Sequence, residues 1–301
     1  HRTVRAAASG CALIPVQPPS IAHSAGVAAA RHHGLPALVT YHTLFEEYLQ
    51  HYVPLLPAAW LRGLARSFSR RQCMVVDTVV VPSSAMADRL TRYGVATPLA
   101  ILPTGIPLAR FARGNGAAFR ASHGIPPERP LALFVGRVAH EKNIGFLLDA
   151  FARAHQRCPE ALLLVTGEGP AMESLRQKAT RLGLADSVRF LGYLDRASAL
   201  PDCYAAADLF VFASRTETQG LVLLEALAAG TPVVALSAMG TADILADAPG
   251  CIAPPDDPQA FGEVVGKLLA DPAACLELAG QARNTAALWS DEAMAGRLAQ
   301  L

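Results

Sequence analysis

Short apolar runs alternate along the chain with longer segments whose apolar positions recur at helical spacing. In the second part of the chain the runs lie at 131–135, 161–165, 188–191, 209–212 and 232–236. Segments 144–157 and 172–182, which separate the first three runs, have the spacing of amphipathic helices. Runs that are apolar throughout and alternate with helices indicate βαβ units in a parallel sheet covered on both faces.

The first part of the chain repeats this pattern more faintly. Its predicted strands lie at 12–16, 37–41, 78–81 and 99–102, and its predicted helices at 21–32, 60–71 and 85–93. The sequence therefore predicts an α/β protein with two Rossmann-like domains, each built on a doubly wound parallel sheet, facing across a ligand-binding cleft.

A stretch rich in Gly, Ala, Arg and Pro, residues 109–130, contains no strong strand pattern and separates the two parts. We expect an N-terminal domain at 1–112, a linker at 113–130, a C-terminal domain at 131–288 and a crossover helix at 289–301.

The length of 301 residues fits two domains, and the 52% share of apolar residues excludes a disordered or fibrous chain. A formal net charge of +1 argues against a nucleic-acid partner. The charge is uneven, however: residues 1–113 hold 11 Arg, no Lys and 4 acids, whereas residues 114–301 hold 15 basic and 21 acidic groups. A basic first part is compatible with an anionic surface as its partner.

Six cysteines lie far apart, without Cys-x-x-Cys pairs or the Cys/His spacing of a zinc site. We interpret them as reduced core residues of a cytoplasmic protein and expect no metal site. No apolar run reaches about 18 residues, so no membrane-spanning helix is predicted. The chain begins with His rather than Met, which indicates that residues are missing in front of it.

The segment 136–143 is a candidate phosphate-binding turn. It follows a predicted strand directly and opens a helix, and it places Arg137 and Lys142 five residues apart. Two cations beside a helix N-terminus suit a polyphosphate. The alternative is an ordinary strand-to-helix turn with solvated charges.

A second candidate segment, 214–235, runs from the end of a predicted strand into a helix that begins near Gly220. Gly220 allows a ligand to approach the backbone, and the N–H groups of Gly220, Leu221 and Val222 can point at phosphate oxygens. Glu217 precedes this helix and Glu225 lies in its second turn, so both can face one small ligand.

Carboxylates accept hydrogen bonds from vicinal hydroxyl groups, so a sugar and a ribose are natural ligands for Glu217 and Glu225. The alternative is that Glu217 caps the helix and Glu225 is exposed. Because the helix around Glu225 is almost wholly apolar, an acid at that position favours a functional role.

Glu217 and Glu225, separated by seven residues and preceded by Arg137 and Lys142, resemble the motif of the retaining glycosyltransferases of family 4, which have the GT-B fold. Further similar segments lie at 103–106, 167–170, 207–211 and 228–234. Within the family, segments 216–220 and 40–48 are most similar to bacterial enzymes that glycosylate diacylglycerol.

The resemblance implies roles for these residues. Arg137 and Lys142 would bind the donor diphosphate and neutralise the leaving group, Glu225 would hold the ribose hydroxyls, and Glu217 would hold hydroxyls of the donor sugar. His42 would reach the reaction centre from the first domain; the alternative is a strand-end histidine with local partners.

The expected catalytic residues are His42, Glu217, Arg137 and Lys142. The expected donor-binding residues are Gly136, Arg137, Lys142, Glu217, Thr218, Gln219, Gly220, Leu221, Val222 and Glu225. No Asp-x-Asp occurs, so we expect neither a metal nor another cofactor. The resemblance further implies transfer with retention of the anomeric configuration.

Segment 60–71 is a candidate membrane contact. At helical spacing, Trp60, Leu64 and Phe68 form one stripe, which Arg62, Arg66, Arg70 and Arg71 accompany. A basic amphipathic helix can lie on an anionic lipid surface, so the protein is expected in the cytoplasm or at the inner face of the membrane. The alternative is a domain helix whose apolar stripe faces the core.

The sequence thus predicts transfer of a hexose from a nucleotide-diphosphate sugar, UDP-sugar by preference, to a lipid hydroxyl such as that of diacylglycerol. Relatives begin with a further strand and a Gly-rich loop that are not found here. Two alternatives stay open: a soluble saccharide or inositol-type acceptor, and a nucleotide-sugar-binding module without turnover. A dinucleotide-binding dehydrogenase is excluded because Gly167-x-Gly169 is followed by Met172 where a third Gly is needed.

Overall fold

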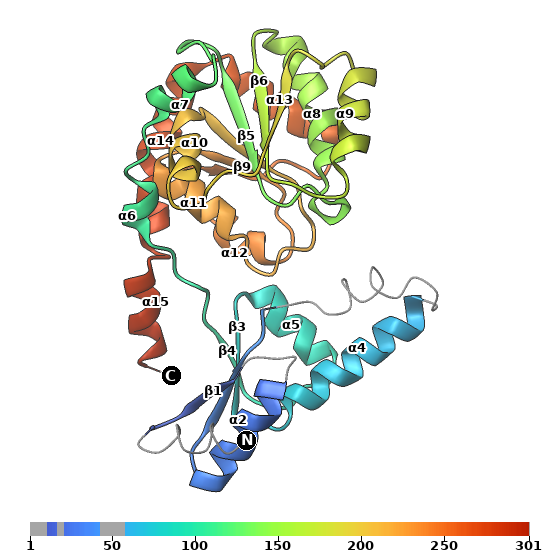
Figure 1. The fold of residues 1–301 in the computed structure, drawn as a ribbon, viewed down its shortest axis with the longest axis vertical. Coiled ribbons are helices and arrows are strands. Elements are labelled where there is room, and N and C mark those ends of the chain that lie inside the picture. The colour runs from blue at the N-terminus through green and yellow to red at the C-terminus, as the bar shows by residue number, and fades with distance from the viewer. Residues whose placement is uncertain (1–10, 17–20, 43–57, 301) are drawn as a thin grey trace. The chain divides into compact units, whose positions relative to one another are not determined.

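The structure, a computed structural model, describes residues 11–16, 21–42 and 58–300. It divides into two compact units: unit 1 comprises 1–103 with 297–301, and unit 2 comprises 104–296. Each unit is an α/β layer structure with a parallel sheet, as predicted (Figure 1). Part of the similar segment 40–48, namely 43–48, lies outside the described residues.

Unit 1 contains a parallel sheet with the strand order β1-β2-β3-β4 among its described residues. Its described elements are β1 (Ile14–Val16), α2 (Ile21–His33), β2 (Ala37–Thr40), α4 (Ala58–Cys73), β3 (Thr78–Val81), α5 (Ser84–Arg92) and β4 (Leu99–Ile101). The predicted strands and helices are confirmed to within two residues at their ends. The hydroxyl of Tyr41 lies 2.6 Å from the hydroxyl of Ser69, which ties α4 to the end of β2.

Unit 2 contains a parallel sheet with the order β10-β9-β8-β5-β6-β7 over its fully described residues. Its strands are β5 (Leu131–Val135), β6 (Leu162–Thr166), β7 (Val188–Gly192), β8 (Leu209–Phe212), β9 (Val233–Ala235) and β10 (Cys251–Ile252). Its helices are α6 (Leu108–Phe111), α7 (Gly116–Ser122), η1 (His140–Lys142), α8 (Ile144–Arg157), α9 (Met172–Arg181), α10 (Ala199–Ala206), α11 (Leu221–Ala229), α12 (Gly240–Leu245), α13 (Pro258–Leu269) and α14 (Pro272–Ala287). A last helix, α15 (Asp291–Leu298), begins in unit 2 and ends among residues assigned to unit 1.

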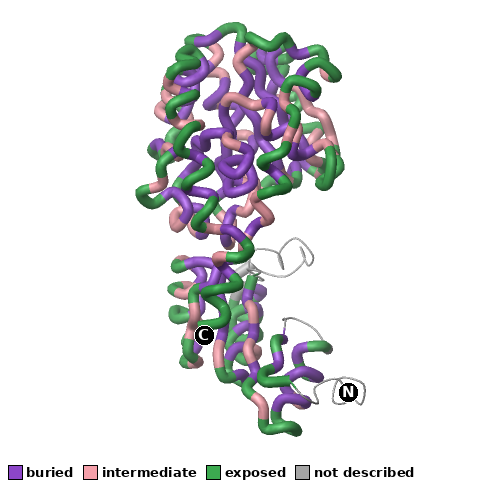
Figure 2. The backbone as a smooth tube through the Cα atoms, turned by 90° about the vertical axis from the view of Figure 1, so that its left-hand side faces the viewer, coloured by how far each residue is buried: buried purple, intermediate pink, exposed green. Residues whose placement is uncertain are grey.

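Apolar strand runs place the core of unit 2 along its sheet. All residues of β5 and β6 are buried, and the rings of Phe134 and Phe212 stack with centroids 5.8 Å apart. Figure 2 shows the buried positions of unit 2 gathered in its interior and the exposed positions toward its outside. Two helices begin with Pro at the first position and an Asp cap: Asp257 accepts from Ala260 N at 2.8 Å, and Asp271 from Ala274 N at 3.1 Å.

The boundary between the units falls ahead of the expected linker, because residues 113–130 are part of unit 2. Arg120 on α7 explains this: it is only 8% exposed and donates to the carbonyl oxygen of Ala206 at 2.8 Å and to the carboxylate of Asp208 at 2.9 Å. Three further carbonyl oxygens, of Pro126, Pro127 and Arg129, accept from the same guanidinium. A fully satisfied buried guanidinium holds this stretch on the sheet.

We expect Gly167→Ala to destabilise the protein by about 3 kcal/mol. Gly167 has φ +121°, and an added Cβ would lie 1.9 Å from the carbonyl oxygen of Gly136. The control is Gly280→Ala on α14, where an added Cβ meets no atom within 4 Å and Ala is favoured over Gly by about 1 kcal/mol. Urea unfolding measures the stability of both variants. A Gly167→Ala variant as stable as Gly280→Ala would contradict the close packing of the loop after β6, which contains Gly167, against the loop after β5, which contains Gly136.

Candidate functional site: the carboxyl edge of the unit 2 sheet

The candidate site lies where the order of the strands reverses. From β5 the chain moves outward to β6 and β7, returns to β8 beside β5, and continues outward to β9 and β10. Loops that follow adjacent strands on either side of such a switch point form the usual ligand crevice of an open α/β sheet. Here these are the loops 136–143 after β5 and 213–220 after β8.

Two hydrogen bonds join these loops. Asn143 donates from its amide to the carbonyl oxygen of Ala213 at 3.1 Å, and Ser214 donates from its hydroxyl to the carbonyl oxygen of Glu141 at 3.2 Å. Asn143 has φ +55°, the left-handed conformation that Asn adopts more readily than most residues. This junction brings Lys142 into an ion pair with Glu217.

The expected phosphate-binding cations are both paired with acids. Lys142 and Glu217 are mostly buried, with side chains 19% and 17% exposed. Arg137, 55% exposed, pairs with Glu141. Burial acts to raise the pKa of Glu141, but the hydrogen bond and charge of Arg137 and the charge of Lys142 bring it below its usual value. The loop therefore carries alternating positive and negative charges that are partly buried and paired with one another.

Close backbone contact with the loop after β6 supports loop 136–143. Val138 N donates to the carbonyl oxygen of Glu168 at 2.9 Å, and Ala171 N donates to that of Val138 at 3.0 Å. A Cβ on Gly169 would lie 2.3 Å from the carbonyl oxygen of Val138. The glycines of the similar segment 167–170 are therefore needed for loop packing.

Helix α11 begins at this edge. Its N-cap is Gly220 with φ +94°, a left-handed conformation that favours glycine, and no side chain caps the helix. The first N–H groups of a helix have no acceptor within the helix. The N–H groups of Leu221 and Val222 therefore point toward the carboxyl edge of the sheet without an intrahelical acceptor. The loop ahead of them is packed by α12, where Gly240 N donates to the carbonyl oxygen of Glu217 at 2.8 Å.

The side chain of Gln219 contacts the backbone of Thr104. Its side chain is buried, its oxygen accepts from Thr104 N at 2.8 Å, and its amide nitrogen donates to the carbonyl oxygen of Thr104 at 2.8 Å. Both ends of the amide are thus engaged with one backbone residue. The expected contact of Gln219 with the donor stays a prediction.

Glu225 is 1% exposed and lies about 6 Å along α11 from the start of that helix. One carboxylate oxygen pairs with Arg196, and the other accepts from the Tyr204 hydroxyl at 2.9 Å. Burial raises the pKa of Glu225, and Arg196 and Tyr204 oppose that rise. The alternative considered from the sequence, in which Glu225 is exposed to solvent, is therefore excluded.

Arg196 and Tyr204 are not among the site residues predicted from the sequence. Arg196 follows β7 by four residues, so the rule that ligands bind at the carboxyl edge of a parallel sheet is the signal that points to it. Tyr204 lies in a mostly apolar helix, where its ring resembles an ordinary core residue. His42 is exposed and follows the end of β2 in unit 1, and its catalytic role stays a prediction.

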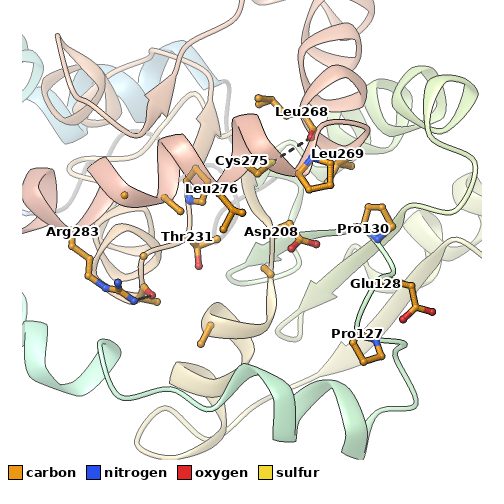
Figure 3. Close-up of a pocket in the computed structure, with 18 residues that line it drawn as sticks. Pro127, Glu128, Pro130, Asp208, Thr231, Leu268, Leu269, Cys275, Leu276 and Arg283 are labelled. Carbon is orange, nitrogen blue, oxygen red and sulfur yellow. Dashed lines mark hydrogen bonds between the residues drawn. The ribbon is translucent and has the colours of Figure 1, made fainter.

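A cavity of about 670 Å³ lies at the opposite edge of the same sheet, near the amino ends of β5, β8 and β9. Pro130, Asp208 and Thr231 line it together with residues of α14, and Cys275 donates to the carbonyl oxygen of Leu268 beside it (Figure 3). It is therefore separate from the residues expected to bind the donor.

Among the described residues, no group of three or more His, Cys, Asp or Glu is placed to hold a metal ion. Of the helices that the structure describes, none has the length and apolarity needed to cross a membrane.

The fold is that of the GT-B glycosyltransferases. HepE of Anabaena, solved with UDP, aligns with a TM-score of 0.80 at 20% identity, covering 100% of this chain and 82% of that one. Sucrose-phosphate synthase of Thermosynechococcus elongatus aligns with a TM-score of 0.78 at 27% identity, covering 99% and 75%. The model of the group 1 glycosyl transferases matches residues 116–286, and that of glycosyltransferase family 4 matches residues 5–110. The chain therefore belongs to the group 1/family 4 glycosyltransferases, which confirms the resemblance predicted from the sequence.

Similar curated proteins modify lipids and inositol phosphate. α-Monoglucosyldiacylglycerol synthase of Streptococcus pneumoniae is 38% identical over 218 residues, which are 70% of this chain and 48% of that protein. D-inositol 3-phosphate glycosyltransferase of Segniliparus rotundus is 36% identical over 203 residues, which are 65% and 45%. The chain spans about half the length of these relatives.

Glu225→Gln provides a test of the burial of this carboxylate. Because the pKa of Glu225 is raised in the folded protein, its contribution to stability is present at low pH and is lost as the pH rises through the folded-state value. Glutamine is nearly isosteric and neutral. We therefore expect the unfolding temperature of Glu225→Gln, relative to the wild type, to increase between pH 5 and pH 8.

Glu141→Gln is the control with the opposite sign. The lowered pKa of Glu141 contributes stability above the unfolded-state value that is lost as the pH falls through the folded-state value. This variant should therefore lose stability relative to the wild type as the pH rises from about 3 to 5. Thermal unfolding at matched pH measures both variants, and parallel trends would contradict the assignment.

Proposed function

We propose that this protein transfers a hexose from a UDP-sugar to the hydroxyl group of a lipid such as diacylglycerol, with retention of the anomeric configuration and without a metal. The observation that carries the proposal is the contact of Lys142 with Glu217 at the switch point, directly ahead of the start of α11. This contact places a cation and a carboxylate beside the amide N–H groups at the start of α11. Cations, amide N–H groups and carboxylates are the groups that a diphosphate-linked sugar requires.

On binding, the donor is proposed to replace the ion pairs that Arg137 and Lys142 form with acids of the chain. Its diphosphate would bind Arg137, Lys142 and the N–H groups of Gly220, Leu221 and Val222. Sugar hydroxyls would take the place of Lys142 on Glu217 with Thr218 beside them, and the ribose hydroxyls would bind Glu225. A UDP-sugar is preferred because HepE, which has the same fold, was solved with UDP and with UDP-glucose.

The chemistry follows from where charge develops. As the bond between sugar and phosphate breaks, the sugar becomes an oxocarbenium-like cation and the diphosphate gains negative charge. Arg137, Lys142 and the start of α11 would stabilise the leaving diphosphate, and a metal ion would not be needed for that role. His42 would contact the sugar from unit 1.

The lipid acceptor is supported by the surface of unit 1. Helix α4 buries Leu61 and Ala65, whereas the predicted apolar stripe is exposed: Trp60 at 75%, Leu64 at 60% and Phe68 at 44%. The predicted alternative, in which this stripe faces the core, therefore does not apply. Arg66, Arg70 and Arg71 are exposed on the same helix, and the side chain of Arg62 lies outside the described residues.

A groove of about 630 Å³ runs between α2 and α4, lined by Leu64, Phe68 and Val75 and by the cations Arg31 and Arg71. Apolar side chains beside guanidinium groups suit the interface of an anionic membrane. The identity of 38% with a diacylglycerol-modifying relative favours the same acceptor class. A soluble inositol-type acceptor is the second candidate, favoured by the 36% identity with the D-inositol 3-phosphate enzyme.

Lys142→Gln is expected to weaken UDP binding at least tenfold, because it removes a charge-assisted contact to the diphosphate. Isothermal titration calorimetry measures the affinity, and Lys267→Gln, an exposed lysine on α13, is the matched control. Transfer of glucose from UDP-glucose to diacylglycerol should also be lost in Lys142→Gln. In the wild type, this transfer should persist in the presence of EDTA. Wild-type protein that binds UDP but transfers no sugar would support the binding module without turnover.

Phe68→Ser is expected to reduce binding to vesicles that contain phosphatidylglycerol by about tenfold, because an inserted aromatic ring is lost. Arg71→Gln should weaken binding to anionic vesicles only. Leu276→Ser is the matched control, since Leu276 is 74% exposed in unit 2. Vesicle flotation at low and high salt measures these effects, and equal binding of Phe68→Ser and the control would favour a soluble acceptor.

A further inference from the structure

The carboxylate of Glu225 is held by two groups from neighbouring segments. Arg196 comes from the loop between β7 and α10, and Tyr204 comes from α10 itself. A carboxylate that is 1% exposed is unfavourable unless it is paired and hydrogen-bonded. Its charge therefore depends on these partners.

The position of Arg196 is built into its loop. The preceding residue, Asp195, accepts three hydrogen bonds at one oxygen: from Ala197 N at 3.1 Å, from Ser198 N at 2.9 Å and from the Ser198 hydroxyl at 2.6 Å. Leu200 N also donates to the carbonyl oxygen of Asp195 at 3.0 Å. This turn fixes the backbone on both sides of Arg196, whose side chain is 59% exposed while it pairs with the buried acid.

Tyr204 is fixed more rigidly still. It is fully buried, its ring lies edge-on to Phe111 with centroids 5.9 Å apart, and its carbonyl oxygen accepts from the Thr231 hydroxyl at 2.7 Å. Burial and the charge of Glu225 raise the pKa of Tyr204 well above its usual range, so its hydroxyl stays protonated and donates to Glu225.

A carboxylate has about four acceptor positions. Arg196 occupies one on the first oxygen and Tyr204 one on the second, so one position on each oxygen is left. Two acceptor positions on neighbouring oxygens match the two vicinal hydroxyl groups of a ribose. This match requires that Glu225 is ionised and that its plane is fixed.

We propose that Arg196 and Tyr204 are positioning residues for a ribose-binding carboxylate: Arg196 keeps Glu225 charged, and Tyr204 sets the orientation of its oxygens. The proposal rests on the proposed function, in which Glu225 binds the ribose of the donor. It assigns to both residues an effect on nucleotides that carry ribose hydroxyls and none on nucleotides that lack them.

The charged and titratable groups that face Glu225 come from three segments. Arg196 and Tyr204 are in direct contact, and Arg110 on α6 adds its charge at longer range. Burial is the largest influence on the pKa of Glu225 and raises it, and these three groups lower it. Removal of Arg196 leaves Arg110 as the remaining cation, so the pKa of Glu225 should rise further.

The test combines two measurements on the full chain. Carbon-13 NMR of glutamate carboxyl groups, assigned with Glu225→Gln, gives the pKa of Glu225 directly. Calorimetry gives the affinity for UDP and for 2′,3′-dideoxy-UDP between pH 5 and pH 8.5. Variants are Arg196→Ala, Arg196→Lys and Tyr204→Phe, and Arg153→Ala is the control, since Arg153 on α8 is a partly exposed arginine that is likewise paired with an acid, Glu263 on α13.

In Arg196→Ala we expect the pKa of Glu225 to rise and the affinity for UDP at pH 7 to fall about tenfold, with the affinity for dideoxy-UDP changed less than about twofold. Arg196→Lys should restore the pKa more fully than the affinity, because Lys keeps the charge but not the planar geometry. Tyr204→Phe should lower UDP affinity with a smaller change in pKa. A merely structural role would change both nucleotides alike.

The failures are distinguishable. If the wild type prefers UDP to dideoxy-UDP, but Arg196→Ala alters neither the pKa of Glu225 nor this preference, the positioning role is overturned and the proposed function stands. If the wild type binds both nucleotides equally, or binds neither, Glu225 is not a ribose ligand, and the proposed donor site and the positioning role both fail.

Discussion

The junction between the loops that follow β5 and β8 is the constraint on which the rest of the site depends. A parallel sheet places the carboxyl ends of neighbouring strands at one edge, but it does not by itself fix the loops beyond them. The bonds from Asn143 to Ala213 and from Ser214 to Glu141 supply that restraint. They bring into contact Lys142 and Glu217, which are 75 residues apart in the chain.

The acids of the candidate site are paired with cations of the same chain. Glu141, Glu217 and Glu225 each pair with a cation, yet burial affects them differently: the pKa of Glu141 is lowered and that of Glu225 is raised. An ion pair that is shielded from water loses much of its gain to desolvation. Because the pairs of Arg137 and Lys142 are therefore not strongly stabilising, a donor bound as proposed would replace Glu141 and Glu217 as their partners at a small net cost, while Arg196 stays on Glu225. Affinity in such a site depends on the difference between the two sets of contacts.

The strands were predictable because wholly apolar runs are stable in few places of a folded chain other than a buried sheet. Among the strands of the described residues, only the two-residue β10 was missed. Tertiary contacts were not predictable. Arg120 stands in a stretch that resembles a solvated linker, and its burial depends on carbonyl oxygens up to 86 residues away. The periodicity of α4 shows that Trp60 and Phe68 share a stripe, but the buried side of the helix is the neighbouring one with Leu61. Of the candidate site, the motif indicated only that Lys142 and Glu217 would bind parts of one donor, whereas their mutual ion pair and the partners of Glu225 required the fold.

Gln219 shows how a motif residue can act through the backbone. Its amide pairs with both the N–H and the carbonyl group of Thr104, the first residue of unit 2. The next residues are held as well, because Ile106 N donates to the carbonyl oxygen of Trp289 at 3.0 Å and a Cβ on Gly105 would lie 2.5 Å from Asp291 Cα. A conformational change in the loop 217–220 must therefore either carry Thr104 with it or break two partly buried hydrogen bonds, each worth about 1 kcal/mol net. The loop expected to contact the sugar is thus mechanically joined to the point at which the chain enters unit 2.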